Sequence, residues 1–266
     1  MIQLGNEDFH LAAGLVARSP LTVEPRAVIC GSNPGWVFVD SIREPRVGLV
    51  WAQGMKGFYL VGDDPPKGFS ERLRGFARTT LARELRQAGL SWIEISAANT
   101  ACEEAIQRAF ADNDLQYDDQ WVYRNPAAGW TVEPRGEAVR LSEAAIANGN
   151  EESIDVVSRI AQFWGSVDKF YETGIGYGVV ENGMIAALCM SGFVDGTVHT
   201  VEIETAERYH RRGHALSAAS HFIADCVGKG HTVHWDCTAT NEASWRLAER
   251  LGLSRIAEYR CYCFKV

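Results

Sequence analysis

The residues best suited to chemistry lie in one stretch of this 266-residue chain, HTVEIETAERYHRRGHA, from His199 to Ala215. A run of β-branched and acidic residues, Val201 to Thr205, leads through a polar corner into RRGHA. Apolar side chains follow at near-helical spacing, at Ala219, Phe222 and Cys226. The pattern predicts a strand, a basic glycine turn and a helix.

The glycine turn has the composition of an anion site. Such a turn gathers free backbone N–H groups at the positive end of a helix, and Arg211 and Arg212 add charge beside them. Gly213 permits a positive φ or the close approach of a ligand, and Ala215 keeps the first helical turn slim. A phosphate is the simplest ligand for this corner. The alternative is an ordinary strand-to-helix turn with solvated arginines.

Two motifs, in the expected order, resemble those of the GNAT acetyltransferase superfamily. Its acetyl-CoA loop has Gln or Arg, two free positions, Gly, one free position, and Gly or Ala. Here the six positions run from His210, which departs from the usual first residue, to Ala215. A short strand, His231 to Cys237, then precedes NEASWRLAERLGL from Asn241 to Leu253, which resembles the superfamily's Asn-led helix and Leu-Gly-Phe ending.

The chain as a whole looks like the GNAT acetyltransferase subfamily that includes the zwittermicin A resistance acetyltransferase. The resemblance is specific in residues 199–260, where EIET precedes the turn and WDC lies in the next strand, and it is vague before residue 140. It implies an α+β (α/β) architecture, the acyl-CoA N-acyltransferase fold, with a mixed central sheet flanked by helices.

The resemblance also implies an activity, an acetyl-CoA-dependent N-acetyltransferase that passes the acetyl group directly to the amine of a small molecule in a ternary complex. Acetyl-CoA (coenzyme A) is the cofactor so implied, and no metal is expected. The residues expected to bind it are the strand residues Ile203 and Thr205, the loop residues His210, Arg211, Arg212, Gly213, His214 and Ala215, and Asn241 and Ser244. The last two can equally be plain helix caps.

The general base is expected on the strand before the loop. Superfamily members often place a Glu or His there, and the candidates are Glu202, Glu204 and His199. Alternation puts the glutamates on one face and His199 on the other, unless a bulge breaks this parity. Glu202 is favoured because a partly buried carboxylate beside an ammonium can be both a base and an anchor. The alternative is that these acids line an exposed strand face.

The sequence indicates the residue that binds the acceptor and the general acid less clearly than it indicates the general base. Asp236, beside Trp235 on the adjacent strand, is a candidate for binding a cationic acceptor, or else a solvated or capping aspartate. Many superfamily members carry a tyrosine in the final helix, at the position that is Ala248 here. The proton for the leaving thiolate would then come from water, or from Tyr259 or Tyr262.

The elements that must position these residues recur twice along the chain. The first half has strand patterns at 36–40, 46–52 and 58–61, a helix at 69–88, a strand at 92–96, a helix at 102–110 and a strand at 120–123. The second half repeats this order with helical patterns at 154–164, strands at 177–181, 185–191 and 199–205, the motif helix, a strand, the NEASW helix and a strand at 259–265.

This order predicts a tandem of a degenerate GNAT-like domain, residues 1–135, and an intact acetyltransferase domain, residues 136–266. In the first half, the link between Val61 and Phe69 reads GDDPPKG where the second half carries RRGHA. An acidic, proline-stiffened corner would repel a pyrophosphate and offer fewer N–H groups.

Composition narrows the class of protein. The chain is 46% hydrophobic and 23% charged, within the ordinary globular range. Its formal charge of −8 argues against a nucleic-acid partner and favours an amine, although solubility alone would explain it. No apolar run approaches the ~20 residues that cross a bilayer, and the start lacks a signal-peptide pattern. We therefore expect a cytoplasmic protein with no membrane partner; a homodimer is left open.

Two other functions stay open at this point. A catalytically silent acyl-CoA-binding or regulatory module would keep the loop without the chemistry, and the missing tyrosine favours it. A tandem-GNAT aminoacyl transferase that uses charged tRNA is disfavoured by the acidic charge. The seven cysteines are scattered without a Cys-x-x-Cys pair, so they indicate neither a disulfide framework nor a zinc site.

Overall fold

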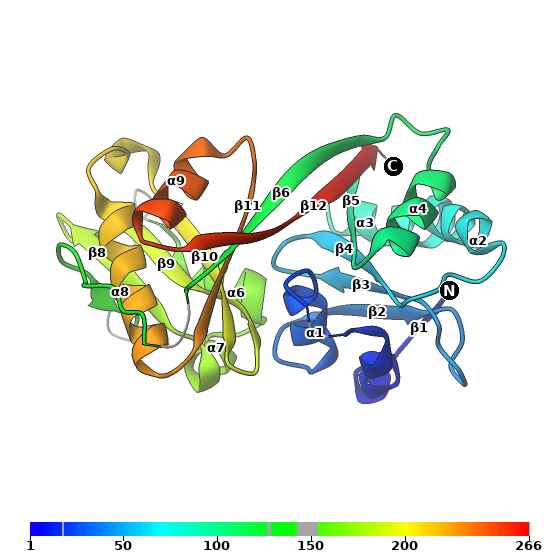
Figure 1. Ribbon diagram of the computed structural model, residues 1–266, viewed down its shortest axis with the longest axis horizontal. Helices are drawn as coiled ribbons and strands as arrows, with labels where there is room; N and C mark the ends of the chain where they lie inside the picture. The colour runs from blue at the N-terminus through cyan, green and yellow to red at the C-terminus, as the bar shows by residue number, and fades with distance from the viewer. Residues whose placement is uncertain (18, 127–128, 143–153, 266) are drawn as a thin grey trace. The chain divides into compact units, whose positions relative to one another are not determined.

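The computed structural model describes residues 1–17, 19–126, 129–142 and 154–265, and the chain divides into two units (Figure 1). The first unit holds Met1–Gln120, Thr238–Thr240 and Ala257–Val266, and the second holds Trp121–Cys237 and Asn241–Ile256. The division thus falls at residue 121 instead of the expected 135/136, and the end of the chain belongs to the first unit.

Two long strands account for this difference. β6 (Gln116–Arg124) belongs to the first unit up to Gln120 and to the second unit from Trp121. β12 (Ser254–Lys265) passes the other way at Ala257, and in the first unit it pairs antiparallel with β5 (Trp92–Ala97). An alternating sequence pattern fixes the faces of a strand but not its neighbour, so this exchange lay outside the sequence prediction.

The second unit contains the predicted strand, glycine turn and helix. Its other elements are β7 (Val139–Arg140), α6 (Val156–Trp164), α7 (Val167–Thr173), β8 (Gly176–Glu181), β9 (Met184–Asp195), β10 (Val198–Thr205), a 3₁₀ turn (Glu207–Tyr209), α8 (His214–Gly228), β11 (Thr232–Thr238) and α9 (Glu242–Arg250). The strand order is β6-β11-β10-β9-β8-β7, with β10 antiparallel to β9 and parallel to β11.

The two faces of this sheet are covered by different helices. α8 packs on β8, β9 and β10, and its buried Ala218, Ala219 and Phe222 form one apolar cluster with residues of the sheet and of α9. α6 contacts β9, where the indole N–H of Trp164 donates to the carbonyl of Ser191 at 2.9 Å. β9 is buried along nearly its whole length, as expected for a strand covered on both faces.

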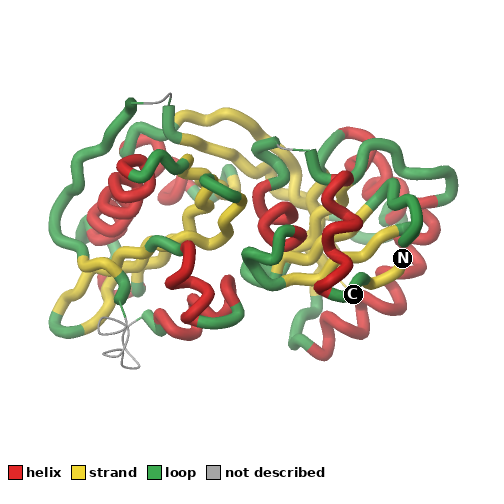
Figure 2. Tube along the Cα trace, turned by 90° about the horizontal axis from the view of Figure 1, so that it is seen from below, coloured by secondary structure: helices red, strands yellow, loops and turns green. Residues whose placement is uncertain are grey.

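The first unit repeats the same order of elements. They are β1 (Ile2–Gln3), a 3₁₀ segment (Asn6–Leu15), α1 (Val23–Ile29), β2 (Gly35–Val39), β3 (Gly48–Ala52), β4 (Gly57–Val61), α2 (Phe69–Phe76), a π-helical turn (Ala77–Leu81), α3 (Ala82–Gln87), β5 and α4 (Thr100–Ala109). The strand order is β1-β2-β3-β4-β5-β12-β6. In each unit Figure 2 shows helices on both sides of the strands.

The repeat is visible in the strand pairing. β2, β3 and β4 form an antiparallel meander and β4 pairs parallel with β5, just as β8, β9 and β10 form a meander and β10 pairs parallel with β11. The predicted mixed sheet flanked by helices, built as a tandem, is confirmed. Among the described residues, no helix has the length and apolar character needed to span a membrane.

Candidate functional site

The loop between β10 and α8 and the first turn of α8, residues 210–216, form a candidate anion site that we call the cradle. Arg211 has φ 61° and Gly213 has φ 86°, so the chain enters the left-handed region twice within three residues. The His210 ring hydrogen-bonds through Nε2 to the carbonyl of Thr205 at 2.9 Å, which ties the loop back to the end of β10. Gly213 is the position that favours glycine, because its φ of 86° lies beyond the small left-handed region, about +50 to +70°, that a residue with a Cβ such as Arg211 can adopt.

The helix that follows directs unsatisfied donors into the same space. The Ser217 N–H donates to the carbonyl of Gly213 at 3.0 Å, so the N–H groups of His214, Ala215 and Leu216 precede this first intrahelical bond. No side chain caps this end of α8. The arrangement supplies backbone donors and the positive end of a fifteen-residue helix, the usual components of a phosphate site.

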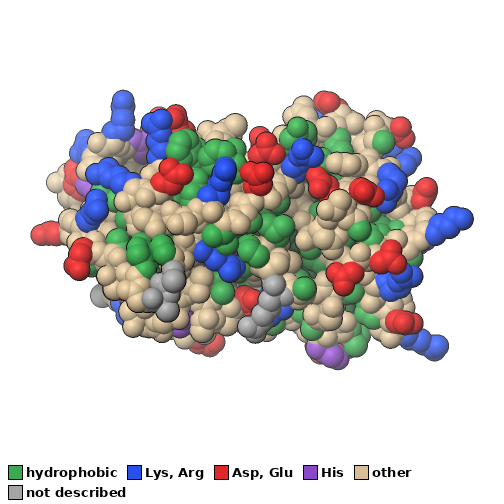
Figure 3. All heavy atoms as spheres, viewed as in Figure 1, with side chains coloured by type: hydrophobic (Ala, Val, Ile, Leu, Met, Phe, Trp, Pro, Cys, Tyr) green, Lys and Arg blue, Asp and Glu red, His purple; other side chains and the backbone are tan. Residues whose placement is uncertain are grey.

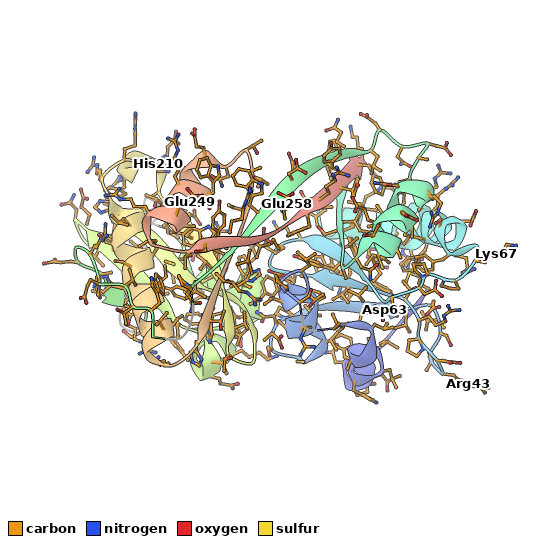
Figure 4. The ribbon with its side chains drawn as sticks, viewed as in Figure 1. Arg43, Asp63, Lys67, His210, Glu249 and Glu258 are labelled. Atoms are coloured by element: carbon orange, nitrogen blue, oxygen red, sulfur yellow. The ribbon has the colours of Figure 1, made fainter. Side chains whose placement is uncertain are left out.

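A cavity of about 500 Å³ opens in front of these donors. One wall is formed by Thr205, Tyr209, His210, Arg211, Gly213, His214, Ala215 and Leu216, which includes most of the predicted cofactor residues. The other wall is α9, and Figure 4 shows His210 on the loop and Glu249 on α9 at this end of the unit. Figure 3 shows Lys and Arg side chains on the same end.

Two arginines of the α9 wall are absent from the sequence prediction. Arg246 and Arg250 line the cavity together with Ala243 and Leu247. Their spacing of three and four residues puts all four side chains on one helical face, which is the signal that could have identified them. They add positive charge across from the cradle.

Glu181, at the end of β8, is a second residue that sequence reasoning missed. One of its carboxylate oxygens pairs with Arg212 at 2.7 Å and the other with Nε2 of His214 at 2.6 Å. Both partners belong to the predicted loop. Glu181 therefore fixes the side chains that flank the cradle, leaving the backbone donors and Arg211 for a ligand.

β10 and β11 separate before β10 reaches this cavity at Thr205. Their parallel pairing runs from Val198 opposite Thr232 to Thr200 opposite His234 and does not continue along the rest of either described strand. Residues 201–205 of β10 consequently pair with β9 alone. In the first unit the equivalent pair remains closed to Leu60 opposite Ala97 and beyond, where the Ala98 N–H donates to the Leu60 carbonyl at 3.0 Å.

Glu202 and Glu204 share one face of β10, as alternation predicted. They lie opposite Met190 and Leu188 of β9, while Ile203 packs in the cluster under α8. Arg159 of α6 pairs with both glutamates, at 2.9 Å from Nε to Glu204 and at 3.6 Å to Glu202. The two acids therefore do not line an exposed face.

The two glutamates differ in their electrostatics. Burial raises the pKa of Glu202 from 4.5 to about 7, with Arg159 opposing the rise and Glu204 adding to it. Glu204 is more exposed, at 36% of its side chain against 19% for Glu202, and holds the closer contact to Arg159. A carboxylate that titrates near neutral pH is suited to general-base work.

His199 lies away from this pair. It is buried, its Nδ1 hydrogen-bonds to the hydroxyl of Ser191 at 2.9 Å, and its ring lies 4.6 Å from that of His231. Burial lowers the pKa of His199 to about 4. The β9–β10 register shifts by one residue between His199 and Val201, where Thr200 alone lies opposite two residues of β9. The extra residue therefore lies in β9 and not in the strand of the glutamates, where a bulge was considered, and the alternation along β10 is unbroken.

The residues predicted around the next helix have structural partners. The Asn241 side chain accepts from the Ser244 N–H at 3.2 Å, which caps α9. The Ser244 hydroxyl accepts from the indole N–H of Trp235 at 2.9 Å, and Trp235 is buried in the core. Asp236, the next residue on β11, is partly buried and by alternation points to the same side of the sheet as Glu202.

Ala248 faces the core and not the cavity. It is fully buried in the cluster under α8, while its neighbour Leu247 lines the cavity. A tyrosine at this position would enter the core, so Ala248 does not mark a lost general acid. Tyr262, predicted as an alternative proton donor to the thiolate, is buried in the first unit, where its hydroxyl donates to Glu103 at 2.7 Å.

The corresponding corner of the first unit has a different character. Between β4 and α2, Asp64 forms an ion pair with Arg46, and Asn99 donates to the carbonyl of Gly62 at 2.8 Å. Figure 4 labels Asp63 and Lys67 at this corner. Its acids and the closed β4–β5 pair support the prediction that this half is degenerate as a cofactor site.

Comparison with known proteins places the chain in a family. A model of the GNAT acetyltransferase family matches residues 22–262. The chain therefore belongs to the GNAT acetyltransferase family and is an acetyltransferase of the GNAT type. It is 24% identical over 238 residues to a protein of Bacillus subtilis named as the uncharacterized N-acetyltransferase YdfB, with 86% of this chain and 85% of that protein covered.

Solved structures show the same fold. A GCN5-related N-acetyltransferase-like protein from Streptococcus suis superposes with a TM-score of 0.67 at 18% identity, over 97% of this chain and 99% of that one. A tandem GNAT protein from the clavulanic acid biosynthesis pathway gives 0.52 at 13% identity, over 99% and 97% of the two chains. These likenesses concern fold alone.

Proposed function

We propose that this protein transfers an acetyl group from acetyl-CoA to the amine of a small molecule, directly and in a ternary complex. The observation that carries the proposal is a single arrangement in the second unit. A glycine cradle at a helix N-terminus lies at the end of the stretch of β10 that is no longer paired with β11, and Glu202 lies on that same stretch.

The cradle suits the pyrophosphate of coenzyme A. Backbone donors at the start of α8 and the side chain of Arg211 would bind its oxygens, and Gly213 lets the phosphates approach the main chain. Interaction with a helix terminus contributes roughly 0.3–2 kcal/mol per charge. Arg246 and Arg250, from the α9 wall, would add charge at the other side of the cavity.

The separated strand edge suits the thioester arm. Backbone groups of residues 201–205 that face away from β9 have no strand partner among the described residues. A backbone N–H directed at the thioester carbonyl would stabilise the negative charge that develops on its oxygen. The closed β4–β5 pair gives the first unit no equivalent edge.

Glu202 would act as the general base. The acceptor arrives as an ammonium, Glu202 takes one proton, the free amine attacks the thioester carbonyl, and the C–S bond breaks as the amide forms. The nitrogen loses its second proton as the amide forms, and this proton reaches the thiolate through water. Glu202 then releases its proton to solvent, so the products are the amide, the free thiol and one proton. Glu204 lies beside Glu202 on the same face, paired with Arg159, and the two acidic side chains would attract the ammonium.

The identity of the acceptor is proposed only by class. Glu202, Glu204 and Asp236 share one side of the sheet and favour a cation, and the chain carries −8 overall. An amino-bearing metabolite, as in the subfamily of the zwittermicin A resistance acetyltransferase, fits this charge better than a nucleic acid or an anionic membrane. A homodimer is compatible with the proposal but is not needed for it.

A silent acyl-CoA-binding module is the second candidate. The absent tyrosine was its main support, and the burial of Ala248 removes that argument. Thiol release from acetyl-CoA over a panel of amines, with the wild type and Glu202→Gln, separates the two. Turnover with any amine that falls at least a hundredfold in the variant supports the enzyme; acetyl-CoA binding without turnover on the whole panel supports the module.

A further inference from the structure

The first unit holds a cavity that has no part in acetyl transfer. It measures about 240 Å³ and lies between the π-helical turn, the end of α4 and the last residues of β12. All of its lining residues belong to the first unit. Its size is slightly below the common range for ligand pockets, about 300–1,000 Å³, so it suits a small molecule.

The rim of this cavity is cationic. Arg78, Arg86 and Lys265 line it, and among the described residues none of the three has an ion-pair partner. The acids near them in sequence are engaged elsewhere, Glu84 with Arg83 at 2.8 Å and Asp112 with Arg74 at 3.2 Å. Three uncompensated cations around one cavity are unexpected in a chain of net charge −8.

Two aromatic rings and an asparagine also line the cavity. Phe110 and Phe264 line it, with ring centroids 4.3 Å apart. Asn113 also lines it, and its buried Oδ1 has no hydrogen-bond partner. A buried acceptor without a partner calls for an explanation such as a ligand or a water molecule.

The helix wall has an irregular backbone. Residues Ala77–Leu81 form a π-helical turn within an otherwise α-helical segment, and the Thr79 hydroxyl donates to the carbonyl of Gly75 at 2.8 Å. The wider turn lets Ala77 and Ala82, five residues apart, line the cavity with Arg78 and Arg86. Such turns occur frequently at functional sites.

We propose that this cavity binds a small organic anion with a planar apolar body. Its carboxylate or phosphate contacts Arg78, Arg86 and Lys265, its body lies against Phe110 and Phe264, and a hydroxyl or amino group donates to Asn113. The site is independent of acetyl-CoA, so the first unit is a ligand-binding half as well as a degenerate copy.

The test is calorimetric titration of 4-hydroxybenzoate into the full chain, with benzoate, inorganic phosphate and 4-hydroxybenzyl alcohol as comparison ligands. 4-Hydroxybenzoate is expected to bind several-fold more tightly than benzoate, which lacks the donor, and more tightly than phosphate or the alcohol. Arg78→Gln/Arg86→Gln is expected to weaken its binding at least tenfold. Arg83→Gln, on the same helical segment but outside the cavity, is the matched control and is expected to bind as the wild type does.

Three results would overturn the proposal. One is the absence of heat of binding, above that of the buffer control, for either aromatic acid at every concentration titrated. Another is equal weakening by Arg83→Gln, which would indicate general surface charge. The third is phosphate binding as tight as that of 4-hydroxybenzoate. Thermal unfolding of each variant checks its fold. Little change is expected for Arg78→Gln/Arg86→Gln, because both side chains are exposed and unpaired. Arg83→Gln removes only a surface ion pair with Glu84, which contributes little to stability.

Discussion

Replacing Glu202 with Gln tests both the electrostatics of the site and the proposed base. Burial raises the pKa of Glu202 from 4.5 to about 7. The folded state therefore binds a proton more tightly than the unfolded state does. By linkage, this group lowers stability as pH rises from about 4.5 to about 7, and its full penalty is present above pH 7.

The magnitude follows from the same shift. Each tenfold change in a proton affinity corresponds to about 1.4 kcal/mol, so the penalty for ionised Glu202 is roughly 3 kcal/mol at pH 8 and under about 1 kcal/mol at pH 5. Gln carries no such penalty. The variant should therefore gain roughly 2–3 kcal/mol of unfolding free energy relative to the wild type between pH 5 and pH 8.

Urea unfolding of both proteins at pH 5, 6, 7 and 8 measures this difference. The same variant should lose about 10²–10⁴ in kcat/KM at pH 8 if Glu202 is the base, and the wild-type kcat/KM should rise with pH through about 7. Glu204→Gln is the matched control. It removes a charge that raises the pKa of Glu202, so its rate profile should shift to lower pH. A stability difference that does not change with pH would refute the reasoning.

Three further variants test the cradle and the cavity walls. Gly213→Val places a β-branched residue at φ 86° and should lower the free energy of unfolding by about 1–2 kcal/mol and weaken acetyl-CoA binding. Gly228→Ala, at the end of α8 and without a positive φ, should have neither effect. Calorimetry compares the two variants. Arg246→Gln/Arg250→Gln should weaken acetyl-CoA binding several-fold, with a smaller effect at 0.5 M salt, and an effect independent of salt would count against direct charge contacts. Ala248→Tyr should lower the free energy of unfolding by about 1–3 kcal/mol through overpacking, and with it the melting temperature, without raising turnover. Increased turnover would show that this position faces the site after all.

The sequence predicted the parts of the fold whose signals are local. The β10–α8 corner combines β-branched alternation, a glycine and an apolar helical stripe, and each signal acts within a few residues. Glu202 and Glu204 kept the predicted common face because the register shift lies before them, between His199 and Val201.

The parts it missed depend on distant partners. Glu181 and Arg159 reach the site from β8 and α6, and nothing near them in sequence indicates the loop or strand that they contact. Asn241 and Ser244 were predicted as cofactor contacts or caps, and the structure shows the cap. The exchange of β6 and β12 between the units was missed because strand patterns specify faces and not neighbours.

The central claim is that the cradle of the second unit binds acetyl-CoA. Calorimetric titration of acetyl-CoA into the wild type and into an Arg211→Gln/Gly213→Val variant tests it most directly. The account predicts one site per chain in the wild type and at least tenfold weaker binding in the variant, with the fold retained. Unchanged affinity in the variant, or no binding by the wild type, would contradict it.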